Sequence, residues 1–191
     1  MNCDVLLLTE VPEKVELPET TIHASVMRMA PRRHWAAVAT QLPFSALPDP
    51  HGASAMAEID GLTVCSSLLP WRSCGTAPPW TGVTTAEKTE AATTSIVSGA
   101  PHVWGGDWNH AMSGREWSGS KQGRRSILEA VDALGLQLPT AGSPHQIDGL
   151  LSIDHIAVPA DWRVIETEHH PALAGGARIS DHDAYVIEAT K

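Results

Sequence analysis

The sequence predicts an α/β sandwich made of two mixed β-sheets flanked by helices. Three observations lead to this fold class. Apolar runs of strand length recur along the chain, two longer segments carry a helical pattern, and Pro- and Gly-rich stretches separate them. Strands come in runs with helices between only some of them, and this order favours a mixed α/β sandwich. We find no repeat, low-complexity tract or linker, so residues 1–191 are expected to form a single domain.

Most of the predicted strands lie in the first half of the chain. Residues 5–8 form a continuous apolar run, which is typical of a buried strand. Residues 53–59 and 62–69 flank Asp60 and Gly61, and an Asp-Gly pair readily adopts the positive φ angles of a tight hairpin turn. Two further strands are expected at residues 21–29 and 35–42.

The second half supplies two predicted helices and the remaining strands. A helix is expected over residues 84–98, because Thr84 and Glu87 match a capping box and Gly99 suits the C-terminal exit. A second helix is expected over residues 121–134, with apolar side chains on one face and Gly135 after its end. The other predicted strands are residues 102–106, 153–158, 163–168 and 184–188, and the predicted loops are residues 43–52, 70–81 and 171–176, of which the first and last are expected to be mobile.

Composition places the chain among ordinary globular proteins, with 42 % hydrophobic and 18 % charged residues. No apolar run approaches the roughly 20 residues that span a bilayer, and the start lacks the basic flank of a signal peptide. We therefore expect a cytoplasmic protein with no membrane partner. The three cysteines form no C-x-x-C pair and are expected to be free thiols. The formal net charge of −9 argues against a dedicated nucleic-acid surface.

Two groups of residues leave alternatives open. Seven tryptophans stand against one tyrosine and one phenylalanine, so Trp is expected to fill the aromatic core. The alternative is that the tryptophans in loop-like sequence line a substrate cleft: Trp71, Trp80 and Trp117. The densest group of basic residues either forms the solvent-exposed start of a helix or contacts a substrate phosphate. Its members are Arg115, Lys121, Arg124 and Arg125.

Four carboxylates stand at or just past strand-like runs: Glu10, Asp107, Asp154 and Asp181. Strands end at a sheet edge, so these side chains can converge on one cleft. Clustered carboxylates repel one another unless a cation binds between them, and oxygen ligands favour Mg²⁺, Mn²⁺ or Ca²⁺. A histidine, His182, follows the last of them. The simplest joint reading is metal-assisted attack of water on a phosphate ester.

Each of these residues also has a plain structural interpretation. Asp107 can cap a turn, and Asn109 can adopt a left-handed turn conformation. His155 follows Asp154 on a strand, so it is expected to point to the opposite face and to serve the structure. For the same reason the adjacent pair His169 and His170 is not expected to share a metal.

In chain order, the motifs Leu8-Thr9-Glu10, Gly106-Asp107-Trp108-Asn109, Ile153-Asp154-His155-Ile156 and Ser180-Asp181-His182 resemble those of the endonuclease/exonuclease/phosphatase superfamily. The resemblance spans nearly the whole chain and implies the deoxyribonuclease I-like form of the sandwich. Each motif alone is weak, whereas all four in order are strong.

The resemblance also implies roles for individual residues. Glu10 would be the principal ligand of Mg²⁺ or Mn²⁺, and Asp181 would complete or support the metal site. Asp107 would orient or deprotonate the attacking water, and Asn109 would hold the phosphate through its amide. Asp154 would hydrogen-bond His182, which would act as a base or as a cationic clamp on phosphate oxygens.

The chain departs from the family pattern at two places. The family's first strand, with its metal-binding Asn, has no room before Glu10, and Asn2 lies too close to Glu10 to replace it, so the domain is interpreted as N-terminally shortened. The family's general-acid histidine is expected to align with Ser67, which is a poor acid near neutral pH. These departures predict a slow enzyme, or one whose substrate has a good leaving group.

The expected function is hydrolysis of a phosphodiester or phosphomonoester, so the expected partner is a phosphate ester, with nucleic acid as one candidate. The acidic charge shifts weight toward a small phosphorylated substrate. The alternative is a catalytically impaired family member that acts as a binding or scaffold domain. A Ca²⁺-stabilised structural domain is disfavoured because no EF-hand-like loop is present. The sequence leaves the oligomeric state open.

Overall fold

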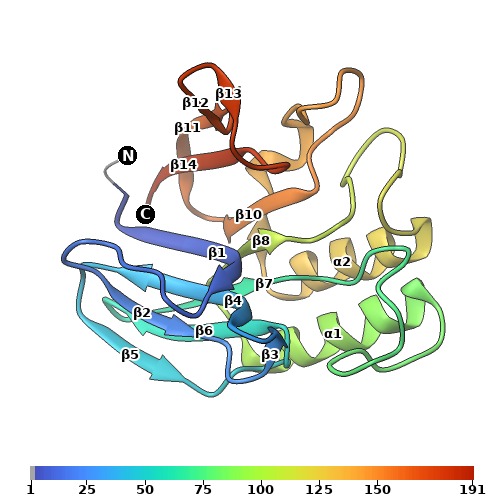
Figure 1. Ribbon diagram of the computed structural model, residues 1–191, viewed down its shortest axis with the longest axis horizontal. Helices are drawn as coiled ribbons and strands as arrows, with labels where there is room; N and C mark the ends of the chain where they lie inside the picture. Colours follow the sequence, from blue (N-terminus) through green and yellow to red (C-terminus); the bar gives the residue numbers. More distant parts are fainter. Residues whose placement is uncertain (1–2) are drawn as a thin grey trace.

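The computed structural model describes residues 3–191 and forms an α/β sandwich with two principal sheets (Figure 1). The predicted fold class is confirmed. Asn2 lies outside the described residues. The smaller principal sheet has the order β1-β4-β2, with β3 also paired to β4, and all its pairings are antiparallel. Its strands are β1 (Val5–Pro12), β2 (Thr21–Ala24), β3 (Arg28–Ala30) and β4 (Arg33–Thr40).

The larger sheet has six strands in the order β5-β6-β7-β8-β10-β9. It is mixed, because β7 and β8 are parallel and its other pairs are antiparallel. Its strands are β5 (Phe44–Leu47), β6 (Ser54–Ile59), β7 (Leu62–Ser67), β8 (Val103–Asp107), β9 (Leu136–Gln137) and β10 (Asp154–Pro159). Two smaller pairs complete the strands: β11 (Arg163–His170) with β14 (Ala184–Thr190), and β12 (Leu173–Ala174) with β13 (Ala177–Arg178).

Period-2 alternation divides the larger sheet into two apolar faces. One face packs on the smaller sheet through a core that includes Val38, Ala57 and Val64. The opposite face packs on the helices through a core that includes Trp104 and Ile127. The helices are α1 (Thr85–Gly99) and α2 (Lys121–Ala133), and a short 3₁₀ helix, η1, spans Pro139–Gly142. Figure 1 shows α1 and α2 side by side on this face of the sheet. Neither helix is both long and apolar enough to cross a membrane.

Local sequence signals fix several boundaries as predicted. Asp60 and Gly61 both have positive φ in the tight turn between β6 and β7. At the start of α1, Thr84 Oγ1 accepts from the Glu87 amide at 3.2 Å, and Glu87 Oε2 accepts from the Thr84 amide at 2.8 Å. Gly135, with φ of 65°, follows the end of α2. Each is a contact between near neighbours in the sequence, which explains why the pattern revealed it.

The end of α1 differs from the prediction. Gly99 stays inside the helix, and Ala100 adopts the left-handed conformation at the cap, with φ of 48°. Gly99 serves a different purpose, because a Cβ there would lie 3.0 Å from the Cβ of Pro50 and 3.3 Å from the sulfur of Met56. The glycine therefore permits α1 to approach the β5–β6 region closely.

Three other expectations were wrong in detail. The strand expected over residues 21–29 is interrupted between β2 and β3. The expected loop at residues 43–52 contains β5, which pairs with β6, although prolines flank it on both sides. The expected loop at residues 171–176 contains β12, which pairs with β13. These strands are short and lie where Pro or Gly dominates. The sequence therefore predicted the chain breaks there but not the pairing of the strands.

Candidate active site

Two carboxylates meet where β8 and β10 lie side by side. Asp107 ends β8 and Asp154 begins β10, and the two residues are direct partners in the antiparallel register. Side chains opposite one another on neighbouring strands share a face of the sheet. This face is the one that meets the smaller sheet, where β1 carries Glu10. Sheet pairing therefore brings together two acids that lie 47 positions apart in the sequence.

The glycines before Asp107 permit this close strand packing. A Cβ on Gly105 would lie 2.6 Å from the His155 carbonyl oxygen and 2.6 Å from Leu7 Cδ1. A Cβ on Gly106 would lie 2.3 Å from the Ser67 carbonyl oxygen, and this residue has φ of 125°. Only glycine fits both positions, so the Gly-Gly-Asp sequence is a steric requirement of the site.

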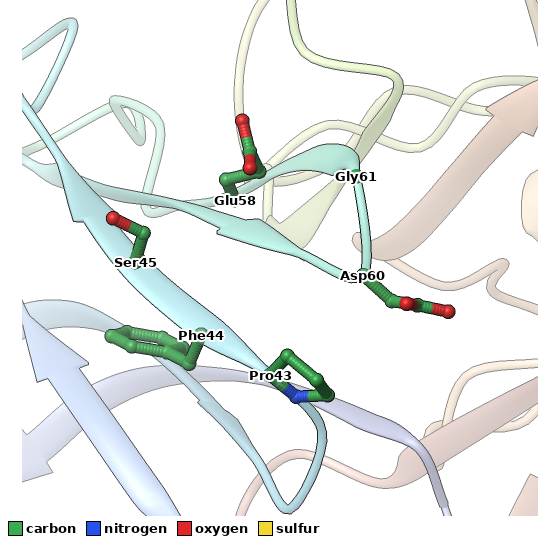
Figure 2. Close-up of a pocket in the computed structure, with 6 residues that line it drawn as sticks. All are labelled: Pro43, Phe44, Ser45, Glu58, Asp60 and Gly61. Atoms are coloured by element: carbon green, nitrogen blue, oxygen red, sulfur yellow. The ribbon is translucent and has the colours of Figure 1, made fainter.

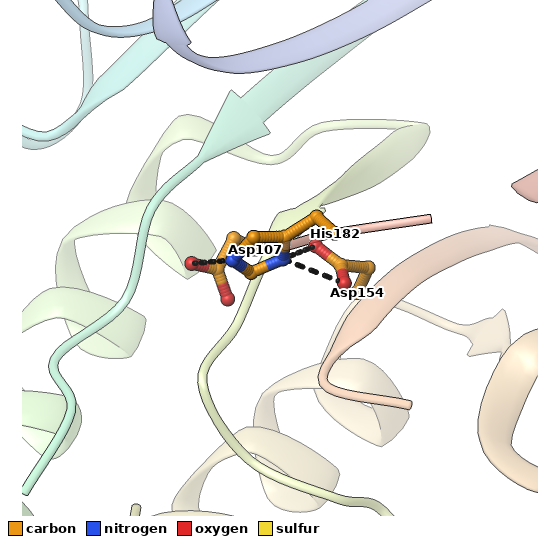
Figure 3. Close-up of side chains that lie close together, drawn as sticks. All are labelled: Asp107, Asp154 and His182. Atoms are coloured by element: carbon orange, nitrogen blue, oxygen red, sulfur yellow. Dashed lines mark hydrogen bonds and ion pairs between the residues drawn. The ribbon is translucent and has the colours of Figure 1, made fainter. Parts of the chain in front are cut away.

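His182 completes a cluster with the two carboxylates (Figure 3). It comes from the loop before β14, and its Nδ1 lies 2.9 Å from both carboxylate oxygens of Asp154. Its Nε2 lies 3.9 Å from Asp107 Oδ2. The potential ligand atoms of these three residues all lie within 4.8 Å of one another. The contact between Asp154 and His182 that the motifs implied is thus present.

Burial and charge set the protonation of this cluster. The hydrogen bond to Asp154 raises the pKa of His182 to about 10 against the opposing effect of burial. Burial raises the pKa of Asp107, and the charge of Asp154 raises it further. At neutral pH the imidazole of His182 is therefore cationic and lies between two carboxyl groups. A cation at this position is the electrostatic complement of the pair.

Asn109 makes its contacts within the site. It has φ of 52°, and its Nδ2 donates to Asp107 Oδ2 at 2.9 Å and to the Leu69 carbonyl at 3.1 Å. Its backbone amide donates to Asp107 Oδ1 at 2.9 Å, and its Oδ1 accepts from Ser118 at 3.1 Å. Both amide hydrogens are used, so in this arrangement Asn109 clamps Asp107 and has none left for a phosphate.

Glu10 and Asp181 lie outside the cluster of three. Glu10 sits at an irregularity of β1 with φ of 53°, and its Oε2 lies 2.9 Å from Arg33 Nη1. Its charge still contributes to the raised pKa of Asp107, so the two carboxylates are close enough to interact. Asp181 is exposed on the loop beside His182, where its charge helps to raise the pKa of that histidine.

Ser67 does not face the site. The residue is fully buried, and its hydroxyl contacts Ser54 Oγ at 2.9 Å and accepts from the Trp104 indole at 3.1 Å. The physical reason is the alternation of side chains along β7, which directs Ser67 to the helix-covered face. Ser66 points to the other face, but its hydroxyl donates to the Leu8 carbonyl at 2.9 Å. The expectation that Ser67 takes the place of a general acid is therefore wrong.

The remaining histidines behave as the strand pattern predicts. His155 points away from Asp154, is buried beside Trp108, and lies 2.9 Å from the His110 carbonyl through Nε2. His169 contacts Asp183, whereas His170 contacts Glu168, so the adjacent pair diverges.

The loop tryptophans separate into two groups. Trp80 is buried and packs edge-on against Trp35, so it belongs to the core, and Trp71 packs against the same cluster. Trp117 is half-buried and lies 4.6 Å from the ring of His145, centroid to centroid. The charges of Asp154 and His182 act on His145, so this aromatic pair borders the site.

The predicted basic group is divided. Arg124 is half-buried, donates to the Gly114 carbonyl and pairs with Glu116 at 3.4 Å, whereas the other three are exposed. Sequence reasoning missed Arg33 and His145, because Arg33 contacts Glu10 and His145 contacts Trp117 across 23 and 28 positions of the chain, which leaves no local pattern. It also missed Asp183, which directly follows His182 and contacts the same loop and the end of β11.

One pocket lies away from the acid–histidine cluster, at the turn between β6 and β7 (Figure 2). Its volume is about 290 Å³, and none of its lining residues belongs to the cluster. Its lining residues are Pro43, Phe44, Ser45, Glu58, Asp60 and Gly61.

Comparison with solved structures shows which known proteins share this fold. The endonuclease domain of TRAS1, a telomere-specific non-LTR retrotransposon, aligns with a TM-score of 0.64 and 16 % identity, over 96 % of this chain and 84 % of that one. An endonuclease/exonuclease/phosphatase family protein from Leptotrichia buccalis aligns with a TM-score of 0.60 and 14 % identity, over 98 % and 87 %. The human Nocturnin catalytic domain, solved with a bound sulfate anion, aligns with a TM-score of 0.58 and 11 % identity, over 97 % and 81 %.

No family model and no curated protein matches the sequence. The likeness to these solved structures is therefore one of fold, at identities too low to carry substrate or activity. The order of the strands, the two-sheet sandwich and the alignment over almost the entire chain agree with the motifs found in the sequence. This chain has the deoxyribonuclease I-like fold of the endonuclease/exonuclease/phosphatase superfamily.

Proposed function

We propose that this protein is a metal-dependent phosphoesterase that hydrolyses its substrate by direct attack of water. One observation carries the proposal: a cationic histidine bonded to one carboxylate and facing a second, at the edge where two sheets meet. Such a cluster offers both a proton acceptor and a positive charge for a phosphate. It needs no nucleophile from the protein, so no covalent intermediate forms.

The carboxylates of the site fit a hard divalent cation, because Mg²⁺ and Mn²⁺ prefer carboxylate oxygens. Glu10 would be the principal ligand, and Asp181 would complete or support the metal site. Asp107 and Asp154 lie beside His182 and would add negative charge near the cation. The exposed ion pair between Glu10 and Arg33 is no barrier, since such pairs contribute only about 0–1 kcal/mol. Bound there, the cation would neutralise charge that builds up on the phosphate oxygens.

The other side chains of the site would have separate roles. Asp107, whose pKa burial raises to about 8, would orient the attacking water and, in its ionised form, take the proton from it. Asn109 would hold Asp107 in place through two hydrogen bonds, a role that its contacts support better than direct phosphate binding. His182, as an imidazolium, would act as the cationic clamp on the phosphate oxygens, and Asp154 would fix its orientation and charge.

The substrate class follows less directly. TRAS1 is named an endonuclease, and the Nocturnin domain was solved with a sulfate anion, which resembles phosphate in shape and charge. Both descriptions are consistent with a site for phosphate esters. We therefore propose that the substrate of this chain is a phosphodiester or a phosphomonoester. Nucleic acid is one candidate partner, with endonuclease, exonuclease and phosphatase action as the alternatives.

The direct test is hydrolysis of bis(p-nitrophenyl) phosphate, p-nitrophenyl phosphate and plasmid DNA with Mg²⁺, Mn²⁺ or EDTA. We expect turnover that EDTA abolishes and that falls about 100-fold or more in His182→Ala, since proton and charge catalysis by such a group contributes 10²–10⁴-fold. His102→Ala, an exposed histidine outside the cluster, is the matched control and should keep its activity. Equal turnover in His182→Ala and wild type would rule out this mechanism.

A catalytically impaired binding or scaffold domain is the second candidate. One observation favours it: Asn109 has no amide hydrogen free for a phosphate. Against it stands the burial of the Asp107 carboxyl beside Asp154, which costs stability and serves no purpose in an inactive site. A folded protein that turns over none of the three substrates with either metal would favour the binding domain.

A further inference from the structure

The loop that carries His182 has a single buried residue. From Pro171 to Asp183 the side chains are exposed or half-exposed, with the exception of Asp183, whose side chain is 1 % exposed. This loop joins β11 to β14 and includes the small β12–β13 hairpin (Figure 1). An exposed loop has little apolar contact to hold its shape, so its geometry depends on its polar anchors.

Asp183 provides such an anchor through three contacts. Its Oδ2 lies 2.8 Å from His169 Nε2 at the end of β11. Its Oδ1 accepts from the Ala172 backbone amide at 2.9 Å and from Arg178 Nη1 at 2.8 Å. One buried carboxylate thus ties the end of β11 and both sides of the small hairpin to the start of β14.

A second set of contacts connects this anchor to His182. Arg178 Nη1 also donates to the Ser180 carbonyl at 2.9 Å, so the guanidinium spans Asp183 and Ser180. The Ser180 hydroxyl in turn accepts from the His182 backbone amide at 3.1 Å. The backbone on both sides of His182 is therefore held by hydrogen bonds that lead to Asp183.

Asp183 and His182 have separate partners. Arg178 pairs with Asp183 at 2.8 Å, while His182 directs Nδ1 to Asp154 at 2.9 Å. A neutral Asn at position 183 would lose the ion pair and could not accept three hydrogen bonds in the same way.

We propose that Asp183 is a positioning residue, which fixes the loop of residues 171–183 so that His182 stays between Asp154 and Asp107. Its catalytic meaning rests on the proposed phosphoesterase function. Small displacements of a catalytic group, of about 1 Å, can cost about 100-fold in rate. The loss of this anchor should therefore reduce turnover more than substrate binding.

The test compares Asp183→Asn and Arg178→Gln with wild type, using Asp161→Asn in an exposed turn as the control. We expect kcat to fall about tenfold or more in Asp183→Asn with KM changed less than about threefold, and a smaller fall in Arg178→Gln. In metal-free protein with ¹⁵N-labelled histidine, the Nδ1–H signal of His182, identified by its absence in His182→Ala, should shift or disappear. The signal of His23, bonded to Asp49 at 2.8 Å, should persist because it reports overall folding.

The outcomes separate the two proposals. An unchanged His182 signal and unchanged kcat in Asp183→Asn would overturn the positioning role. If Asp183→Asn does not fold, as the loss of the His23 signal would show, Arg178→Gln decides by the same criteria. If wild type lacks activity, the proposed function fails, whereas the His182 signal still shows whether Asp183 positions the histidine.

Discussion

At the scale of single residues, the site is defined by which acid has which partner. Asp107 is clamped by Asn109, Asp154 holds His182, and Glu10 pairs with Arg33. The first two are buried or half-buried contacts, and the third is exposed. Water and ions can therefore displace the partner of Glu10 more readily than the partners of Asp107 and Asp154.

This difference leads to a prediction for metal binding. Mg²⁺ should stabilise the folded protein by mass action, by about 2.7 kcal/mol at a metal concentration 100 times the Kd. Glu10→Gln removes the charged ligand and should abolish most of the gain, as measured by thermal unfolding with and without Mg²⁺. Glu16→Gln, an exposed acid on the following segment, should keep it. Equal stabilisation of Glu10→Gln and wild type would exclude Glu10 as a ligand.

At the scale of elements, the site depends on how closely β8 lies against its neighbours. A Cβ on Gly105 would overlap backbone atoms of β10 and a side-chain atom of β1. Backbone atoms cannot move away as a flexible side chain can. The sheet therefore sets the place of Asp107 through glycines that have no chemical function themselves.

Gly105→Ala should therefore destabilise the protein by about 1–3 kcal/mol, because the added methyl overpacks a filled site. Activity should fall with it, since the register of Asp107 and Asp154 is disturbed. Gly142→Ala is the matched control: no atom lies within 4 Å of a Cβ there, so stability should hardly change. Urea denaturation of the two variants checks the prediction, and similar stabilities would contradict it.

At the scale of the whole molecule, buried titrating groups couple stability to pH. The hydrogen bond to Asp154 raises the pKa of His182 to about 10, so the folded state holds this proton more tightly than the unfolded chain. That stabilisation is complete below about pH 6.5 and is lost as pH rises through about 10. Burial lowers the pKa of His155 to about 4, so its effect has the opposite sign. Stability is lost there as pH falls from about 6.5 toward 4.

Burial and the charge of Asp154 raise the pKa of Asp107 to about 8, so this group stabilises the folded state at acidic pH, and that stabilisation is lost as pH rises from about 4 toward 8. Metal-free protein should thus be most stable at mildly acidic pH. The gap in unfolding free energy between wild type and His182→Ala should be largest below about pH 6.5 and should narrow toward pH 10. Urea unfolding in EDTA at several pH values measures this gap. A gap that stays constant across the alkaline range would show that His182 does not carry the proton that we assign to it.

Much of the fold was readable from the sequence because its signals are local. The capping box of Thr84 and Glu87 and the Asp60-Gly61 turn each involve near neighbours. The short strand β5 was missed since its pairing with β6 overrides the prolines around it. Ser67 was misassigned for a related reason: a shift of one residue along a strand moves a side chain to the other face, and the motif could not show the pleat.

The sequence by itself determined the sandwich, both helices and the order of the acidic motifs, because periodicity and turn chemistry act over a few residues. The tertiary structure alone decided which groups meet: Asp107 with Asp154 by strand register, Glu10 with Arg33, and Ser67 with Trp104. These contacts join segments far apart in the chain, where burial and geometry, rather than local preference, select the partner.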